Sequence, residues 1–348
     1  MTGAARRVGV ALLAVGPRRG DHRVAVRAAV SVAVPLLTVW ALGRLDLGIY
    51  ASFGAFASLY GRHDAYPDRI RMQLAAGAAV GAAMLVGTAL SVLQAPDAVC
   101  VLVVAATAAV GTLVSWVSRW HPPGALFLVF AAGATATLPA DVDTFAGVLL
   151  VGGGSVLFAV AITLGIALSR GGLHRGPVRR RERVGATGAE MALTAGAGTL
   201  LAGMLALLLL GSHWYWAMVG AVAALGGAHV TARLVRGTQR LLGTLAGVLV
   251  AAGLLAVQLP PLATIGVAVL LQAGAELYVG RNYGIAMVFV TPLALLMVQL
   301  AAPVDPALLL RDRVIDTVIG VAVGTVVAMV SSAIRRRVMG GHPDPRLG

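Results

Sequence analysis

The sequence predicts an all-α, polytopic membrane protein made of two copies of one unit. Of the 348 residues, 59% are hydrophobic and only 12% are charged, which is too little polar surface to cover a water-soluble globule. The apolar residues come in long runs, and a helix needs about 17 to 25 such residues to cross a hydrocarbon core of roughly 30 Å. Backbone groups in lipid have to bond one another, so these runs are expected to be helices.

The duplication is visible in the glycines. Shifting the second half of the chain back by 166 positions (220 − 54) places five of its glycines on the five that lie between positions 54 and 87. Gln239 falls on Gln73 at the same offset. An internal repeat of this kind predicts that the chain contains two copies of one structural unit. The matched pairs are Gly54 and Gly220, Gly61 and Gly227, Gly77 and Gly243, Gly81 and Gly247, and Gly87 and Gly253.

Twelve apolar runs follow one another along the chain. In the first half they cover about 24–43, 47–61, 72–93, 98–118, 122–138 and 144–169. In the second half they cover about 190–210, 213–230, 241–259, 261–279, 283–302 and 313–334. As helices they give two six-helix repeats, 24–169 and 190–334, a basic linker at 170–189, and tails at 1–23 and 335–348. Six is even, so both repeats enter the membrane from the same side and are parallel.

The basic residues predict the orientation. All 27 are arginine, and most lie in the two tails, the linker and the loops on the same side of the membrane. Cytoplasmic loops carry such an excess, so both termini and the linker are expected in the cytoplasm of a multi-pass protein of the inner (plasma) membrane. The net charge of +13 is explained by this topology, and we expect the lipid bilayer rather than nucleic acid as its surroundings. The sequence leaves the oligomeric state open, a homo-oligomer included.

Four blocks of the second half carry a family resemblance. They are YWA at 215–217, QRLLGTLAG at 239–247, RNYGIAMVFVTP at 281–292 and RVIDTVIG at 313–320. In this order and spacing they resemble the fusaric-acid-resistance or aromatic-acid-exporter family of inner-membrane proteins. The first half is similar through its glycines and through HPPGALFLVF at 121–130, so the resemblance extends over about 24–334.

The resemblance implies efflux of aromatic carboxylates or other amphipathic small molecules, coupled to the proton gradient. Larger members that resemble this chain carry a substantial cytoplasmic domain between the halves. Only the short linker at 170–189 stands there in this sequence.

Two interrupted spans indicate a substrate region. Pro122 and Pro123 begin one short span, and Pro292 lies inside its counterpart. Proline breaks the helical hydrogen-bond ladder, and matching breaks in two halves mark the binding site of many transporters. A helix amino terminus opened in this way suits a carboxylate, while an ordinary kink is the alternative. The candidate substrate-binding residues are Tyr215, Trp216, Arg240, Arg281, Asn282, Tyr283, Thr291 and Pro292.

Each of these candidates also has a simpler interpretation. Aromatic residues near the ends of spans are often anchors at the membrane surface, and the positive-inside rule alone requires arginines at the cytoplasmic ends. Arg240 and Arg281 are favoured over the other arginines because they lie inside the family blocks.

Two acids are expected within the membrane, Glu276 and Asp316. A carboxylate there is costly while charged, which makes it a candidate proton carrier. Asp316 follows Arg313 by one helical turn, so a structural ion pair is the rival interpretation. Glu276 lies near the cytoplasmic end of its span and is the weaker candidate for proton coupling.

The glycine pairs Gly77 and Gly81, and Gly243 and Gly247, form GxxxG patterns. Small residues at this spacing let helix backbones approach closely in lipid, so we expect them to serve packing.

No enzyme, metal or cofactor is expected. His63 and Asp68 form an H-x4-D pattern of the acyltransferase type, but such short patterns recur by chance. The seven histidines are scattered and the single cysteine, Cys100, has no partner, so neither a metal site nor an intrachain disulfide is supported. The chain has no GxxxxGK[ST] loop for direct use of ATP.

The expected function is therefore a secondary transporter that exports an anionic or amphipathic aromatic compound from the cytoplasm. An anion channel of the same architecture is the nearest alternative. A membrane scaffold or assembly factor that transports nothing is the alternative from another class.

Overall fold

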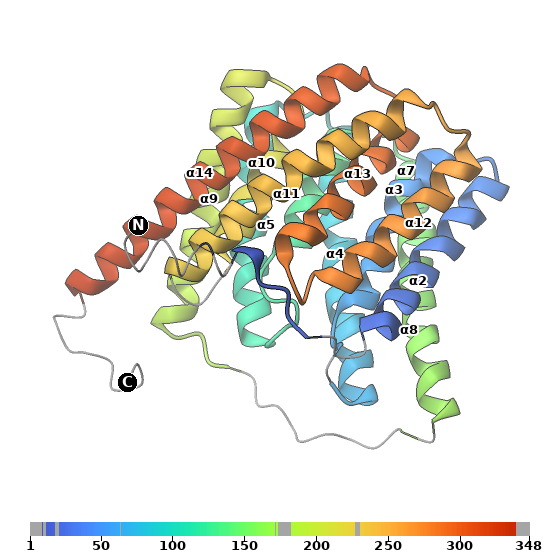
Figure 1. Ribbon diagram of the computed structural model, residues 1–348, viewed down its shortest axis with the longest axis horizontal. Helices are drawn as coiled ribbons and strands as arrows, with labels where there is room; N and C mark the ends of the chain where they lie inside the picture. The colour runs from blue at the N-terminus through green and yellow to red at the C-terminus, as the bar shows by residue number, and fades with distance from the viewer. Residues whose placement is uncertain are drawn as a thin grey trace.

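The computed structural model describes residues 9, 12–17, 21–62, 64–170, 172, 182–226 and 230–338, the last range without the side chains of 230, 231 and 335–338. Within these residues the secondary structure is entirely helical. The predicted all-α class is therefore confirmed, and Figure 1 shows the helices gathered into one bundle.

Nine helical runs of the described part are long and apolar enough to cross a membrane, so the protein is a multi-pass membrane protein. One of the nine joins α7 (Thr144–Gly147), a π-helical segment (Val148–Gly152) and α8 (Gly153–Ser169). The others are α2 (Asp21–Ala41), α4 (Tyr66–Val92), α5 (Asp97–Val117), α9 (Ala186–Leu210), α11 (Val230–Ala256), α12 (Pro261–Tyr278), α13 (Tyr283–Ala301) and α14 (Pro306–Val338).

The remaining three of the twelve expected spans are short helices. They are α3 (Gly48–Ala55), which lies within a helical run from Leu45 to Leu59, α6 (Leu126–Ala136) and α10 (Tyr215–Leu225). The 11 residues of α10 rise only about 16 Å at 1.5 Å per residue. These helices are shorter than the apolar runs at 122–138 and 213–230 because described residues within those runs, such as Pro122 and Gly226, are not helical.

Prolines and glycines limit the length of two of these elements, α6 and α10. The chain reaches α6 through Pro122 and Pro123, and then through Gly124, which has a φ of +89° that other residues rarely adopt. The helix α10 stops at its carboxyl end before Gly226, whose backbone is extended rather than helical. Ten of the eleven residues of α10 are buried, so this short helix lies inside the bundle rather than at its lipid-facing surface.

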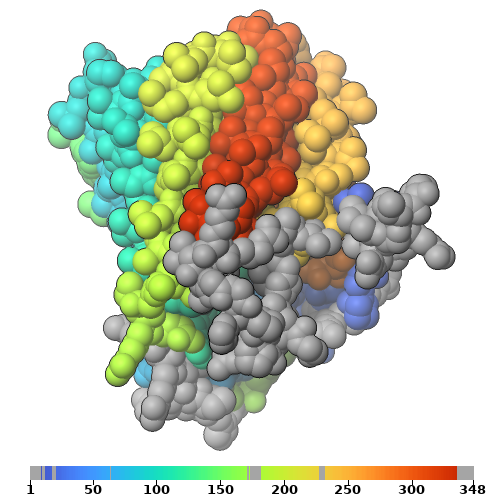
Figure 2. Space-filling model, turned by 90° about the vertical axis from the view of Figure 1, so that its left-hand side faces the viewer, coloured from blue at the N-terminus to red at the C-terminus, as the bar shows by residue number. Residues whose placement is uncertain are grey.

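Long helices surround the short ones. The helix α10 packs against α14, α9, α6 and α11, while α3 packs against α2 and α8. Figure 1 shows α9 and α14 toward one end of the long axis and α2, α8 and α12 toward the other. On the face seen in Figure 2, α9 and α14 lie side by side, and many of their leucine and valine side chains are exposed there.

The connections between helices gather at two ends of the bundle. At the arginine-rich end, the backbone N–H of Gly61 donates to His121, and the Gly16 N–H donates to the Arg281 carbonyl, each at 3.0 Å. At the opposite end, Ser91 donates to the Leu138 carbonyl at 2.6 Å. The two ends therefore differ in charge as the sequence predicted, with arginines concentrated at one of them.

Close helix packing is confirmed at three of the four predicted GxxxG glycines. A Cβ added to Gly243 would collide with the Gly284 carbonyl, and one added to Gly247 would lie 2.7 Å from the Thr291 Cβ, so α11 packs directly on α13. In the first half, Gly77 meets Val156 of α8, but Gly81 faces open space. Gly243 and Gly247 thus both serve helix packing, whereas in the other pair Gly77 does and Gly81 does not.

Replacing Gly243 by Ala is expected to destabilise the protein by about 1–3 kcal/mol, because the added methyl group overpacks the α11–α13 contact. Gly253→Ala, on the same helix with nothing within 4 Å of its Cβ position, is the matched control. The measurement is thermal unfolding in detergent. Equal unfolding temperatures for the two variants would show that the α11–α13 contact tolerates a side chain.

Candidate functional site

A cavity of about 170 Å³ lies between the two halves of the chain, toward the arginine-rich end of the bundle. The short helix α6 and the end of the α3 run form one side of it, and α10, α11, α12, α13 and α14 of the second half form the rest. An engineered protein cavity of about 150 Å³ takes up benzene. This space therefore matches one aromatic ring.

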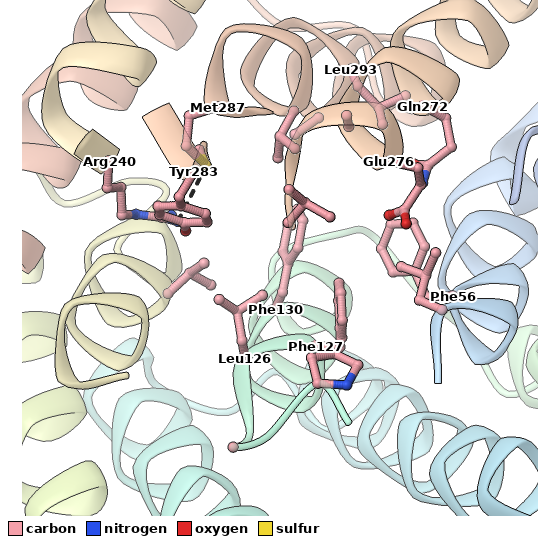
Figure 3. A pocket seen from close by; sticks show the side chains of 18 of the residues that line it. Phe56, Leu126, Phe127, Phe130, Arg240, Gln272, Glu276, Tyr283, Met287 and Leu293 are labelled. Atoms are coloured by element: carbon pink, nitrogen blue, oxygen red, sulfur yellow. Dashed lines mark hydrogen bonds between the residues drawn. The ribbon is translucent and has the colours of Figure 1, made fainter. Parts of the chain in front are cut away.

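Aromatic side chains form the apolar wall of the cavity. Phe127 and Phe130 lie one turn apart on α6, and therefore on the same helical face. Phe127 packs against Phe56 at 5.1 Å between ring centroids, and Phe130 packs against Trp216 of α10 at 4.8 Å. Figure 3 shows these phenylalanine rings beneath the second-half helices. The wall joins elements from both halves of the sequence.

Three arginines form a cationic side. The Arg240 Nη1 donates to the Tyr283 hydroxyl at 2.8 Å, and Figure 3 shows this contact at one edge of the cavity. The Arg236 guanidinium lies 4.1 Å above the same tyrosine ring, and the Arg313 guanidinium lies 4.0 Å above the Trp216 ring. Such cation–π contacts stabilise a charge that is removed from water.

These three arginines have no carboxylate within 4 Å among the described residues. The Nε atoms of Arg236, Arg240 and Arg313, and one terminal nitrogen of Arg313, are buried without a hydrogen-bond partner. Leaving charged donors buried and unsatisfied is costly. The site thus carries excess positive charge that an anion can neutralise.

The opposite side of the cavity holds an ion pair. The Arg62 Nη2 lies 2.6 Å from Glu276 Oε2, which joins the loop after the α3 run to α12. Glu276 is 5% exposed, and the amide of Gln272 lies one turn before it on the same helix. Figure 3 shows Glu276 and Gln272 across the cavity from Arg240. Because Glu276 is paired, it does not neutralise the three other arginines.

Asp316 lies on α14, fully buried, just outside the lining of the cavity. Neither of its carboxylate oxygens has a hydrogen-bond partner, and no ion pair within 4 Å joins it to Arg313 in the described part. The ion pair that the sequence left open is therefore not formed here. A buried carboxylate without a hydrogen-bond partner is costly while it is charged.

A second carboxylate lies one turn earlier on α14 and is fully satisfied. Asp312 accepts hydrogen bonds from Ser212 at 2.7 Å and from Arg311 at 2.8 Å, and His213 Nδ1 lies 3.0 Å from it. This cluster ties the loop before α10 to α14. Of these two acids on α14, Asp316 is the one without a hydrogen-bond partner.

Two of the predicted substrate residues hold the amino-terminal segment instead of lining the cavity. Arg281 Nε donates to the Gly16 carbonyl at 2.9 Å. The Asn282 amide donates to the carbonyls of Leu12 and Ala14 at 2.9 and 3.0 Å, and its oxygen caps α13 by accepting from the backbone of Ile285. These residues fix the loop that leads into Tyr283.

The other predicted residues divide between lining and packing. Trp216, Arg240 and Tyr283 line the cavity, as do Glu276 and the prolines Pro122 and Pro123. Thr291 is buried against Gly247, and Pro292 is buried in α13 without lining the cavity. Tyr215 and Trp216 are each 1% exposed, so they are not anchors at the membrane surface.

Several lining residues were not among the predicted substrate-binding residues. Arg236 lies one turn before Arg240, and Arg313 begins the RVIDTVIG block, so helical spacing and the family block were available signals. Phe56 and Phe130 carried no such signal because their partners lie in the other half of the chain. No cluster suited to a metal occurs among the described residues, and His63 lies outside them.

Comparison with known proteins gives one family. A family model described as fusaric acid resistance protein-like matches residues 192–327, the part that supplies α10 to α14. No curated protein and no solved structure matches the chain. The chain is therefore a multi-pass membrane protein whose residues 192–327 are similar to the fusaric acid resistance protein-like family.

Proposed function

We propose that the protein is a secondary transporter that exports aromatic carboxylates or similar amphipathic anions across the plasma membrane, coupled to protons. The observation that carries this proposal is a ring-sized cavity with an aromatic wall and three arginines that lack carboxylate partners. An aromatic ring packs on Phe127 and Phe130, while a carboxylate accepts charge-assisted hydrogen bonds from Arg240 and Arg313. An aromatic carboxylate therefore matches both the aromatic wall and the arginines of the cavity.

The helix bounds support two parallel repeats. At the offset of 166 that the glycines show, α2 falls on α9, α3 on α10, α4 on α11 and α5 on α12. The short α6 falls on the part of α13 that follows Pro292. The packing is also reciprocal, because α5 contacts α9 just as α12 contacts α2. We therefore assign twelve membrane segments to two six-helix units, with the cavity between them.

The distribution of arginine supports a cavity that faces the cytoplasm. Pro122, Pro123 and Arg62 line it at the end where the arginine-bearing loops meet. By the positive-inside rule that end, both termini and the linker lie in the cytoplasm. A substrate made in the cell then enters the cavity directly.

Coupling to protons is assigned to Asp316. It is buried, lacks hydrogen bonds and lies one turn from Arg313, whose guanidinium lines the cavity. A carboxylate of Asp316 and the carboxylate of a substrate both interact with that guanidinium, so protonation of Asp316 changes the charge that the substrate meets. Glu276 is a weaker candidate because Arg62 already neutralises it.

Replacing Arg240 by Gln is expected to raise the KM for benzoate about 10- to 100-fold, because a charged hydrogen bond contributes about 1.5–3 kcal/mol. Uptake of labelled benzoate into everted vesicles measures the change. Arg281→Gln is the matched control, since Arg281 does not line the cavity. A rise in KM as large for Arg281→Gln as for Arg240→Gln would contradict the assigned site.

Replacing Asp316 by Asn is expected to abolish accumulation of benzoate against its gradient while equilibration down the gradient persists. The amide has nearly the shape of the acid but cannot exchange a proton. The assay imposes a proton gradient on everted vesicles, with Asp305→Asn in an exposed loop as the control. Full accumulation by Asp316→Asn would make this residue structural.

A wild-type protein that accumulates no aromatic carboxylate would argue against export. Steady anion conductance in a planar bilayer would then identify a channel, and its absence would identify a scaffold.

A further inference from the structure

Three cavities of the bundle are adjacent, because each shares lining residues with the next. The inner cavity described above holds about 170 Å³, a small apolar space beside it holds about 50 Å³, and a pocket at the opposite end of the bundle holds about 330 Å³. We call the small space the neck and the last one the outer pocket. The outer pocket lies where the loop before α10 meets the ends of α5 and α6.

The same side chains separate the neighbouring cavities. Phe56, Phe130 and Leu293 line both the inner cavity and the neck. Ile49 and Val298 line both the neck and the outer pocket. A residue that lines two cavities is a wall one side chain thick, so two such walls stand between the inner cavity and the outer pocket.

The neck itself is tightly closed. Phe53 packs edge-on against Phe130 with 4.9 Å between ring centroids, and the Ser52 hydroxyl lies 3.5 Å from the Met297 sulfur. A space of about 50 Å³ is too small for a benzene ring, which occupies a cavity of about 150 Å³. Its apolar lining also removes a carboxylate from water without compensation. An aromatic anion therefore cannot pass in this state.

The neck is built from elements that end near it. Ile49 and Phe53 belong to the short α3, Phe130 belongs to the short α6, and Met297 belongs to the part of α13 beyond Pro292. The helices α3 and α6, and the part of α13 beyond Pro292, are each too short to span the membrane. Shifts of such short elements change the neck without moving the long helices around it.

The outer pocket differs from the inner cavity in charge. Asp97 and His213 line it, and no arginine of the described chain does. Asp97 accepts a hydrogen bond from Trp214 at 3.3 Å. An anion that gains several arginines in the inner cavity gains none here, so the outer pocket binds it more weakly.

We propose that the neck is the outer gate of the transport path and that the outer pocket is the chamber from which an aromatic carboxylate is released. This inference rests on the proposed transport function. It adds the route, the gate residues Ile49, Phe53, Phe130 and Met297, and a second place for the substrate. Passage requires Phe130 to move out of the wall between the inner cavity and the neck. It also requires Ile49 to move out of the wall between the neck and the outer pocket.

The single cysteine makes a direct test available. In a Cys100→Ser background, one cysteine at a time is introduced at Thr137 in the outer pocket, at Leu126 in the inner cavity, or at Met297 in the neck. A membrane-impermeant methanethiosulfonate is applied to right-side-out or everted vesicles. We expect Thr137→Cys to react from the outer face only, Leu126→Cys from the cytoplasmic face only, and Met297→Cys from neither.

A second substitution is then added to the Met297→Cys variant, in one of the two walls of the neck at a time. Phe130→Ala is expected to speed labelling of Met297→Cys from the cytoplasmic face by at least about tenfold, equivalent to lowering the barrier by about 1.4 kcal/mol. Ile49→Ala is expected to do the same from the outer face. Phe127→Ala is the matched control, because Phe127 lines the inner cavity but not the neck. Phe130→Leu, a milder change, supports the same test if the alanine variant does not fold.

The labelling pattern does not depend on any substrate. Met297→Cys that reacts readily from the outer face without a second substitution, or that ignores both Phe130→Ala and Ile49→Ala in folded protein, overturns the gate. If this pattern holds but Cys100→Ser protein accumulates no benzoate, the transport proposal fails and the gated path stands. If benzoate accumulates but the pattern is absent, the gate fails alone.

Discussion

Burying guanidinium groups inside an apolar bundle is the constraint on which the site depends. Arg240 and Arg313 are 3% and 1% exposed, and charges at such depth are expensive unless they are compensated. The protein compensates them in part with aromatic groups, the hydroxyl of Tyr283 and the ring face of Trp216, rather than with carboxylates. A carboxylate would have neutralised the site permanently. Aromatic partners stabilise the cations while leaving hydrogen-bond donors unused.

The packing glycines make this arrangement geometrically possible. Gly243 and Gly247 bring α11 into contact with α13, which places Arg240 of one helix against Tyr283 of the other. Gly220 approaches Gly320 so closely that α10 and α14 touch by their backbones, and this contact accompanies the stacking of Arg313 on Trp216. The glycines repeated along the sequence therefore position the cations as well as pack the helices.

The sequence predicted the class of fold and part of the site for physical reasons. Long apolar runs determine membrane helices, so twelve spans were expected, and nine of them are long helices in the described part of the chain. The family blocks contained Trp216, Arg240 and Tyr283. The lengths of α6 and α10 were not predictable from apolar runs, because Pro122, Pro123 and Gly124 before α6, and Gly226 after α10, lie within those runs without being helical. Pairings such as Phe130 with Trp216, or Asn282 with the segment near Leu12, join parts of the chain that no local pattern relates.

The unequal charge of the two ends of the path determines where free energy has to be supplied. On the proposed path, an anion leaves the arginines of the inner cavity and meets Asp97 in the outer pocket, so we expect leaving the inner cavity to be the uphill step. A driving force is effective only if it acts on the groups that hold the anion there. Among the described residues, Asp316 is the carboxylate one turn from Arg313 that has no hydrogen bond of its own. On the proposed mechanism, a proton that binds or leaves at Asp316 acts on the step that limits release.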